Sequence, residues 1–222
     1  GDTEVIIHAF DKWGVDCFNI FEGMFAFALI DNYKKIGYLV RDQLGIKPLF
    51  YLETSKGIIF SSEIKVFLNE QSLSLNESRI YEQIMYRYIS GKETIYNEIQ
   101  RVNAGSYIEI DSNFEYNEIE YFSLEDSLIN SNNNVDYHQI ENEINKSILR
   151  HTRSDVGYNI QLSGGLDSSY ITSVLAKTNS QIRTYSVTLN SEDDEKRYQE
   201  YISKKYNTNH HELELNDNNF ID

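Results

Sequence analysis

The chain has 222 residues, too many for one small domain and too few for two complete ones at roughly 100 to 200 residues per domain. Hydrophobic residues make up 40% and charged residues 25%, which is typical of a folded protein. A net charge of −15 argues against nucleic acid and membranes as partners, because proteins bind both through basic surfaces. The single cysteine excludes a disulfide scaffold. Since no long apolar run or secretory signal is present, we expect a cytoplasmic protein.

The first third is expected to combine a helix with short strands. Apolar residues recur at helical spacing from Glu4 to Cys17. Four short apolar runs predict strands, and their short links indicate an antiparallel sheet: Met24–Ile30, expected to be buried on both faces, Gly37–Val40, Leu49–Leu52 and Gly57–Ser61. Pro48 and Gly45 predict a fixed turn within Arg41–Leu49.

The middle of the chain shows two helical segments and a hairpin. The helical signals are at Glu63–Leu68 and Glu77–Ser90, and the hairpin joins Ser106–Ile110 to Phe114–Phe122. The polar run 130–134 is the best domain boundary, although the link can also begin near 69–76. We therefore expect three parts: 1–70, a linker or bridge with the hairpin over 71–134, and 135–222.

After the boundary, helices and strands alternate, which indicates a parallel α/β sheet. The predicted helices are Val135 to about His151, Ser168–Lys177 and Asp194–Tyr206, and the predicted strands are Val156–Leu162, Gln181–Leu189 and His211–Leu215. Neither end of the chain reads as natural, because it starts on Gly1 and stops after Asn216–Asp222 without a closing signal. Both ends are expected to be internal positions of a longer protein.

The most informative segment is Ser-Gly-Gly-Leu-Asp-Ser-Ser at 163–169, here called the phosphate loop. It follows a predicted strand and opens a predicted helix, where backbone N–H groups and the positive helix end favour a phosphate. Two glycines permit a tight turn, serine hydroxyls add donors, and Asp167 could hold Mg²⁺. The loop has no Lys for a kinase-type P-loop, and Ser168 stands where a dinucleotide fingerprint needs its third Gly. Gln161 excludes a nucleophile elbow.

This loop resembles the PP-loop of ATP pyrophosphatases, and its form is most similar to that of glutamine-dependent asparagine synthetases. Thr184–Val187 is similar to the second strand of that family, where its members contact adenine, although Thr188 replaces the usual Gly. Thr208–Leu213 is similar to the family segment before the third strand. The resemblance implies ATP and Mg²⁺ as cofactors, with Asp167 as metal ligand. The residues it implies for ATP are Leu162, Ser163, Gly164, Gly165, Asp167, Ser168 and Val187.

The amino-terminal motifs resemble the class II glutamine amidotransferase domain of the same enzymes. They are Gly1–Val5, Glu22–Ala28, Arg41–Leu49 and Ser61–Lys65, in family order. The implied fold is the α+β, antiparallel-sheet part of an N-terminal-nucleophile domain, followed by an α/β, parallel-sheet PP-loop synthetase domain, both truncated. Asp2 matches the residue that binds the α-amino group of glutamine, although locally it equally suits a helix N-cap.

No catalytic nucleophile is expected in this chain. The family uses an N-terminal cysteine, whereas residue 1 is Gly, and Cys17 lies on an apolar helical face typical of an inert core cysteine. The fragment alone is therefore expected to be inactive. His210 and His211 are adjacent strand residues that point to opposite faces, so we expect structural roles rather than a metal site.

The resemblance implies ATP-dependent amidation of aspartate through β-aspartyl-AMP, with glutamine as nitrogen donor. The expected partners are small molecules (glutamine, aspartate and ATP), with a homodimer possible for the whole enzyme. Two alternatives remain open. The acceptor could be another carboxylate, on a sugar, a peptide or a lactam precursor, or the chain could be a catalytically dead nucleotide-binding protein.

Overall fold

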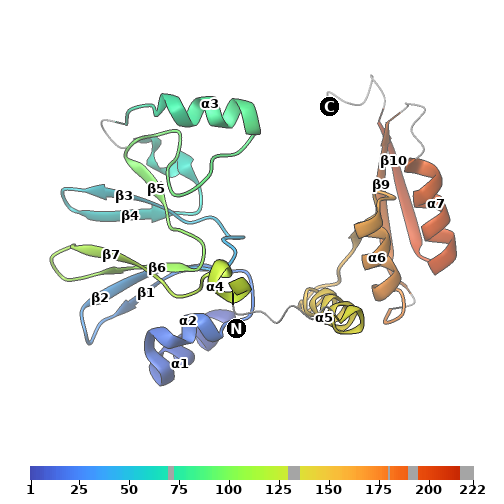
Figure 1. Cartoon of the computed structure of the whole chain (residues 1–222), viewed down its shortest axis with the longest axis horizontal. Helices are drawn as coiled ribbons and strands as arrows, with labels where there is room; N and C mark the ends of the chain where they lie inside the picture. The colour runs from blue at the N-terminus through green and yellow to red at the C-terminus, as the bar shows by residue number, and fades with distance from the viewer. Residues whose placement is uncertain (70–72, 130–135, 180, 190–194, 216–222) are drawn as a thin grey trace. The chain divides into compact units, whose positions relative to one another are not determined.

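The computed structural model describes residues 1–69, 73–129, 136–179, 181–189 and 195–215. The chain forms two compact units, 1–132 and 133–222 (Figure 1). The predicted linker 130–134 and the predicted helix starts at Val135 and Asp194 lie outside the described residues. The division into 1–70, 71–134 and 135–222 stays a prediction.

The first unit consists of two antiparallel sheets with helices. Its helical segments are α1 (Asp2–Trp13), η1 (Gly14–Asp16), α2 (Cys17–Ile20), η2 (Ile64–Asn69), α3 (Glu77–Tyr86) and α4 (Leu124–Ile129). Its strands are β1 (Ala26–Asp31), β2 (Ile36–Arg41), β3 (Phe50–Thr54), β4 (Gly57–Ser61), β5 (Ile99–Arg101), β6 (Ser106–Ile110) and β7 (Tyr116–Glu120). The strand orders are β1-β2-β6-β7 and β4-β3-β5. The α+β, antiparallel prediction is therefore confirmed for this unit.

Three apolar clusters hold these layers together. On one face of the first sheet, Tyr38 and Val40 of β2 pack with Phe18 of α2. On its other face Leu39 packs with Tyr51 of the second sheet. A third cluster joins β3 and β5 to η2 through these residues: Phe50, Leu52, Ile99 and Phe67. The two sheets therefore pack face to face, and helical segments cover their outer faces.

Two sequence predictions for the first sheet and the helix before it are wrong. The run Met24–Ile30 does not form a strand buried on both faces, because half-buried and exposed residues alternate along β1 from Phe27 onward and Ile30 is 71% exposed. β1 is also the edge strand of its sheet. β2 is the strand with both faces covered, and an apolar run alone cannot tell an edge strand from a central one. The single helix predicted from Glu4 to Cys17 is divided after Trp13, where Gly14 has φ +60°.

The turn after β2 is organised by two neighbouring charged side chains. The Arg41 guanidinium donates to the carbonyls of Gly45, Lys47 and Val102 at 2.6 to 2.9 Å. The Asp42 carboxylate is 1% exposed and accepts backbone N–H groups at 2.9 to 3.3 Å from Phe25, Leu44, Ile46 and Lys47. Gly45 has φ +63°, and a Cβ there would lie 2.9 Å from the Arg41 guanidinium carbon. The predicted turn is thus held by polar contacts as well as by Pro48 and Gly45.

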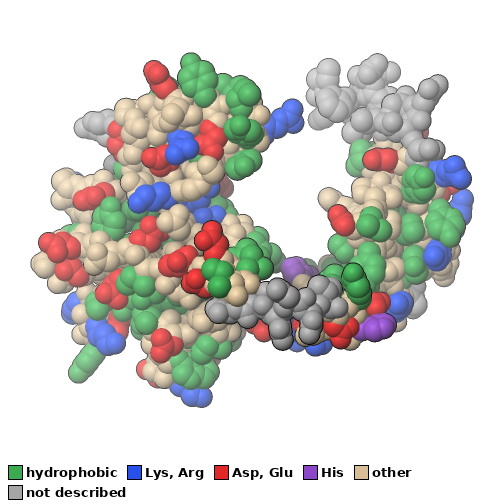
Figure 2. Space-filling model, viewed as in Figure 1, with side chains coloured by type: hydrophobic (Ala, Val, Ile, Leu, Met, Phe, Trp, Pro, Cys, Tyr) green, Lys and Arg blue, Asp and Glu red, His purple; other side chains and the backbone are tan. Residues whose placement is uncertain are grey.

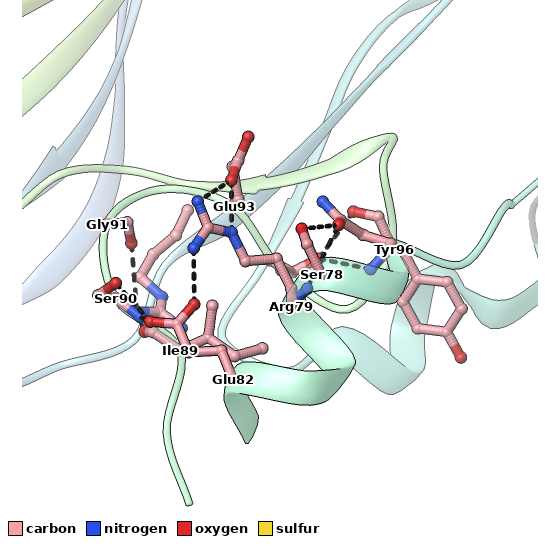
Figure 3. Close-up of polar contacts among 11 residues, drawn as sticks. Ser78, Arg79, Glu82, Ile89, Ser90, Gly91, Glu93 and Tyr96 are labelled. Carbon is pink, nitrogen blue, oxygen red and sulfur yellow. Dashed lines mark hydrogen bonds and ion pairs between the residues drawn. The ribbon is translucent and has the colours of Figure 1, made fainter. Parts of the chain in front are cut away.

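Helix α3 makes polar contacts with the segment after it and exposes several large apolar side chains. Arg79 donates to Glu82 at 2.6 Å and to Glu93, and Glu82 accepts the Ser90 N–H at 3.0 Å and the Ser90 hydroxyl (Figure 3). These contacts, with Ser90 first, lower the pKa of Glu82 to about 2. Hydrophobic side chains gather on the outside of α3 and the residues after it (Figure 2), including Tyr81, Ile84, Met85 and Tyr88. The helix predicted to reach Ser90 ends at Tyr86, because Arg87 is left-handed.

The second unit is a small parallel sheet with helices. Its elements are α5 (Tyr137–Arg150), β8 (Ile160–Gln161), α6 (Leu166–Leu175), β9 (Arg183–Leu189), α7 (Glu195–Tyr206) and β10 (Asn209–Leu215). The strand order is β10-β9-β8, and both pairs are parallel. Its core contains Ile160, Leu175 and Ile182, against which Ile148 of α5 packs. A parallel sheet is confirmed at this small scale, but the predicted strand Val156–Leu162 shrinks to two residues.

Replacing Asp42 tests whether the turn holds the first unit together. Asp42→Ala leaves several backbone N–H groups without an acceptor, so we expect a loss of about 3 kcal/mol or more in the free energy of unfolding. Urea unfolding followed by the fluorescence of Trp13, the only tryptophan, reports on this unit.

The matched control is Asp31→Ala, because Asp31 accepts two N–H groups in an exposed turn. We expect it to cost about 1 kcal/mol or less. Equal losses in the two variants would contradict the role given to Asp42.

Candidate functional site

The phosphate loop starts from a fixed point at the carboxyl end of β8. Leu162 is 1% exposed, and its N–H donates to the Tyr185 carbonyl of β9 at 2.8 Å. The Ser186 hydroxyl donates to the Leu162 carbonyl at 2.5 Å. Both backbone groups of Leu162 are therefore tied to the central strand, which fixes where the loop leaves the sheet.

Gly164 lies against the start of α7 in a conformation that favours glycine. Its φ is +84°, and a Cβ there would lie 2.9 Å from the Glu195 carbonyl oxygen and 3.2 Å from Tyr198 Cβ. L-residues with side chains rarely adopt positive φ, and the backbone of α7 cannot yield as a flexible side chain can. The first glycine of the motif is thus required by both backbone conformation and packing.

The rest of the loop directs polar groups around the start of α6. The hydroxyls of Ser163 and Ser168 lie 3.0 Å apart, and the Gly165 N–H donates to the Ser163 hydroxyl at 3.3 Å. Gly165 is the N-cap of α6 and offers no side chain to cap it. Because the first N–H groups of a helix lack intrahelical partners, this end can receive an anion.

Asp167 lies in the first turn of α6, and its side chain is exposed. An exposed carboxylate beside a phosphate-binding helix end suits Mg²⁺, which takes one or two carboxylates together with phosphate oxygens and waters. In the described parts of the chain, no three His, Cys, Asp or Glu side chains gather as a ready metal cage. The fit to Mg²⁺ therefore depends on Asp167 acting together with a bound phosphate.

Val187 and Thr188 face opposite sides of the sheet. Val187 is 56% exposed, whereas Thr188 is 9% exposed and donates its hydroxyl to Glu212 at 2.7 Å on the same side as the buried Thr184 and Ser186. The side chain at the position of the family's usual Gly therefore does not lie on the face of Val187. An adenine ring placed on Val187 would not meet it.

The two histidines do point to opposite faces, as predicted. His210 Nδ1 lies 2.9 Å from the Thr184 hydroxyl on the covered face, and burial lowers its pKa. His211 stacks on Tyr185 of the exposed face, with ring centroids 5.0 Å apart. Neighbouring hydroxyl and aromatic groups thus account for both side chains.

In the first unit, Asp2 and Cys17 have different surroundings. Asp2 is an exposed residue in the first turn of α1, whose N-cap is Gly1, so the N-cap alternative for Asp2 is wrong. Cys17 is 0% exposed in the cluster of Phe18 and Tyr38, and burial raises its pKa to about 11. A buried neutral thiol is a packing group rather than a nucleophile.

The structure thus gathers the loop residues Ser163, Gly164, Gly165, Asp167 and Ser168 between β8 and α6, with Leu162 at their start and Val187 on the next strand. Asp2 belongs to the other unit. Sequence analysis missed Gln199 of α7, whose side-chain amide donates to the Ser163 carbonyl at 3.2 Å. A lone Gln on an otherwise polar helix gives no motif by which this contact could be found.

Comparisons with known proteins agree with the two-part architecture. Residues 1–122 match the family described as glutamine amidotransferase domain, and residues 139–222 match the family described as asparagine synthase. The putative glutamine-hydrolysing asparagine synthetase 2 of Methanocaldococcus jannaschii is 28% identical over 99% of this chain and 44% of its own length. Asparagine synthetase 2 of Bacillus subtilis is 31% identical over 96% of this chain and 30% of its own length.

Asparagine synthetase B of Escherichia coli is 27% identical over 96% of this chain and 36% of its own length. The chain therefore spans 30% to 44% of the length of these three relatives. Both family matches fall on the segments that carry the predicted motifs, which confirms the resemblance. The chain belongs to the glutamine-hydrolysing asparagine synthetase family, with an amidotransferase part followed by a synthase part.

Proposed function

We propose that this chain is part of an enzyme that makes asparagine from aspartate, ATP and glutamine. In this reaction the side-chain carboxylate of aspartate attacks the α-phosphorus of ATP, and pyrophosphate leaves. Ammonia from glutamine then displaces AMP from β-aspartyl-AMP. The products are asparagine, AMP, pyrophosphate and glutamate. The observation that carries the proposal is the phosphate loop, which turns between β8 and α6 with its glycine against α7.

The loop residues divide the work on ATP. The hydroxyls of Ser163 and Ser168, together with the backbone of Gly164 and Gly165, face the negative charge that builds on pyrophosphate as it leaves. Val187, which is 56% exposed, supplies an apolar contact for adenine, whereas Leu162, which is 1% exposed, fixes the start of the loop through its backbone. Asp167 holds Mg²⁺, which neutralises phosphate oxygens.

Glutamine is assigned to Asp2 in the amidotransferase part. An ammonium group that is partly removed from water needs a charged partner, and a carboxylate supplies it. Asp2 is exposed at the start of α1, so its side chain is accessible to a ligand. Cys17 is buried, so it is not assigned as the attacking thiol.

We also propose that the partners are small molecules and that the whole enzyme works in the cytoplasm, as a homodimer. The charge of −15 disfavours nucleic acid and anionic membranes. Each helix in the described ranges is too short or too polar to cross a membrane.

The acceptor and the nitrogen donor can be tested together in the complete gene product. We expect asparagine from aspartate and MgATP with either glutamine or ammonium as donor. Asp2→Asn should raise the KM for glutamine about ten-fold or more, because it removes one charge from an ion pair, and leave the ammonium-dependent rate unchanged. Asp11→Asn, on the same helix, is the control. Activity with another carboxylate but not with aspartate would contradict the acceptor.

The role of Asp167 can be measured by calorimetry with MgATP. Asp167→Ala should raise the Kd for MgATP about ten-fold, because the metal loses a protein ligand, and should change the Tm by about 2 °C or less. Without Mg²⁺ the variant should bind ATP more tightly than the parent, because it lacks a carboxylate that repels the metal-free polyphosphate. The exposed Asp155→Ala is the control. An unchanged Kd for MgATP would show that Asp167 does not hold the metal.

The effects of replacing each of the two loop glycines on the stability of the second unit can be compared directly. Gly164→Ala should destabilise the second unit by about 2 kcal/mol, because positive φ and the contact with Glu195 both oppose a side chain. Gly165 has φ −70°, and a Cβ there would lie 3.4 Å from the Ser163 hydroxyl. We expect about 1 kcal/mol or less from Gly165→Ala. Hydrogen exchange of β9 amides measures both, and equal effects would be inconsistent with the packing of Gly164 on α7.

A further inference from the structure

On its α7 side, the phosphate loop is contacted by a side chain that does not belong to the loop motif. Gln199, in the second turn of α7, donates its Nε2 to the Ser163 carbonyl at 3.2 Å. Its Cγ would lie 3.3 Å from a Cβ on Gly164, so the side chain also packs on the loop backbone. Ser163 and Gly164 therefore lie directly on Gln199.

A contribution to the stability of the fold does not explain why residue 199 is a glutamine. The residue is 2% exposed, and among the described residues its Oε1 is the one buried side-chain nitrogen or oxygen atom without a hydrogen-bond partner. An unpaired buried acceptor is destabilising, and a half-satisfied amide is worse for stability than an apolar side chain of the same length. A methionine would fill this space without that cost. The presence of the amide must therefore be explained by the hydrogen bond that its Nε2 donates to the Ser163 carbonyl.

The geometry of the peptide bond shows what this hydrogen bond does to the next N–H group of the loop. In a planar trans peptide the C=O and the following N–H point in opposite directions, and none of the described peptides is cis. Because Gln199 holds the Ser163 carbonyl toward α7, the Gly164 N–H is turned away from α7. That side is the one left open to a ligand, since α7 occupies the other.

We propose that Gln199 is a positioning residue for phosphate: it fixes the Ser163–Gly164 peptide so that the Gly164 N–H points at the bound anion. This inference rests on the proposed function, because it assumes that the loop binds the pyrophosphate part of ATP. The unpaired Oε1 is a cost that the fold carries for the orientation of the loop.

A separate set of contacts fixes α7 itself. Lys196, one turn before Gln199, pairs with Glu212 of β10 at 2.8 Å, and Glu212 also accepts the Thr188 hydroxyl. These contacts, with Lys196 first, lower the pKa of Glu212. Removing the Gln199 amide should therefore leave α7 in place, so that the orientation of the loop can be tested apart from folding.

The test compares Gln199→Met with the parent chain, and with Gln139→Met on the exposed side of α5 as control. Calorimetry with inorganic pyrophosphate and Mg²⁺ gives the Kd. Hydrogen exchange followed by mass spectrometry gives the protection of the loop and of β9. Gln199→Met should raise the Kd about three- to ten-fold, the effect of one hydrogen bond. It should speed exchange in a peptide covering 162–166 at least about three-fold while β9 stays as protected as in the parent, or more so.

Two results would overturn the inference. One is a Kd and loop exchange equal to those of the parent, and the other is a loss of protection in β9 that matches the loss in the loop, which marks a merely structural residue. Failure of the proposed function is recognised separately, since the parent chain would then not bind pyrophosphate at all.

Discussion

The close approach of Gly164 to the backbone of Glu195 constrains everything around the phosphate loop. A loop that lies this near a helix has one side closed by protein, so its donors can only serve the other side. The contact also couples segments that are 31 positions apart in the sequence, because α7 must be docked on the sheet before the loop has anything to lie on. The proposed anion binding at this helix end thus depends on the docking of α7 as well as on the glycines of the motif.

The covered face of β9 is built to support that docking. Its inward side chains are Thr184, Ser186 and Thr188, where an ordinary buried strand would carry aliphatic groups. Each hydroxyl has a partner on a neighbouring segment: Thr208 and His210 for Thr184, the Leu162 carbonyl for Ser186, and Glu212 for Thr188. Directional contacts specify position more sharply than apolar packing does. The central strand therefore orients the start of the loop on one side and β10 on the other.

Local patterns were enough to find the loop but not its environment. The segment Ser163–Ser169 predicts a phosphate loop because its glycines, hydroxyls and helix start are adjacent in sequence, and adjacent residues stay close together in the fold. The same holds for the opposite directions of His210 and His211, which follow from strand alternation. The contact between Gln199 and Ser163 joins distant segments, and no periodicity encodes which side chain of a polar helix will face a carbonyl.

The errors in the first unit have the same physical origin. The apolar run from Met24 to Ile30 has the composition that is typical of a central strand. In the described sheet, however, β1 is an edge strand that pairs only with β2. Strand order is a property of the whole sheet, so the run could not reveal it. For the turn at Arg41–Asp42, local residues were sufficient, because Gly45 and Pro48 predict a turn. They do not predict how it is fixed, since the buried side chains of Arg41 and Asp42 contact residues far away in the sequence, Val102 and Phe25.

The acidic composition has a consequence for the proposed chemistry. The seven residues of the phosphate loop offer hydroxyls and N–H groups but no lysine or arginine, and the chain carries a net charge of −15. Neutral donors can orient a polyphosphate, but they do not cancel its charge, and the field of surrounding carboxylates is screened only beyond about 8 to 10 Å at physiological salt. In the proposed function, a metal ion is therefore the charge-compensating partner of the phosphates at this loop. Asp167 adds a negative charge to an anion site, which is unfavourable without a cation and favourable with one. Under the proposed function, the same carboxylate thus makes nucleotide binding depend on Mg²⁺ and opposes the binding of a metal-free nucleotide.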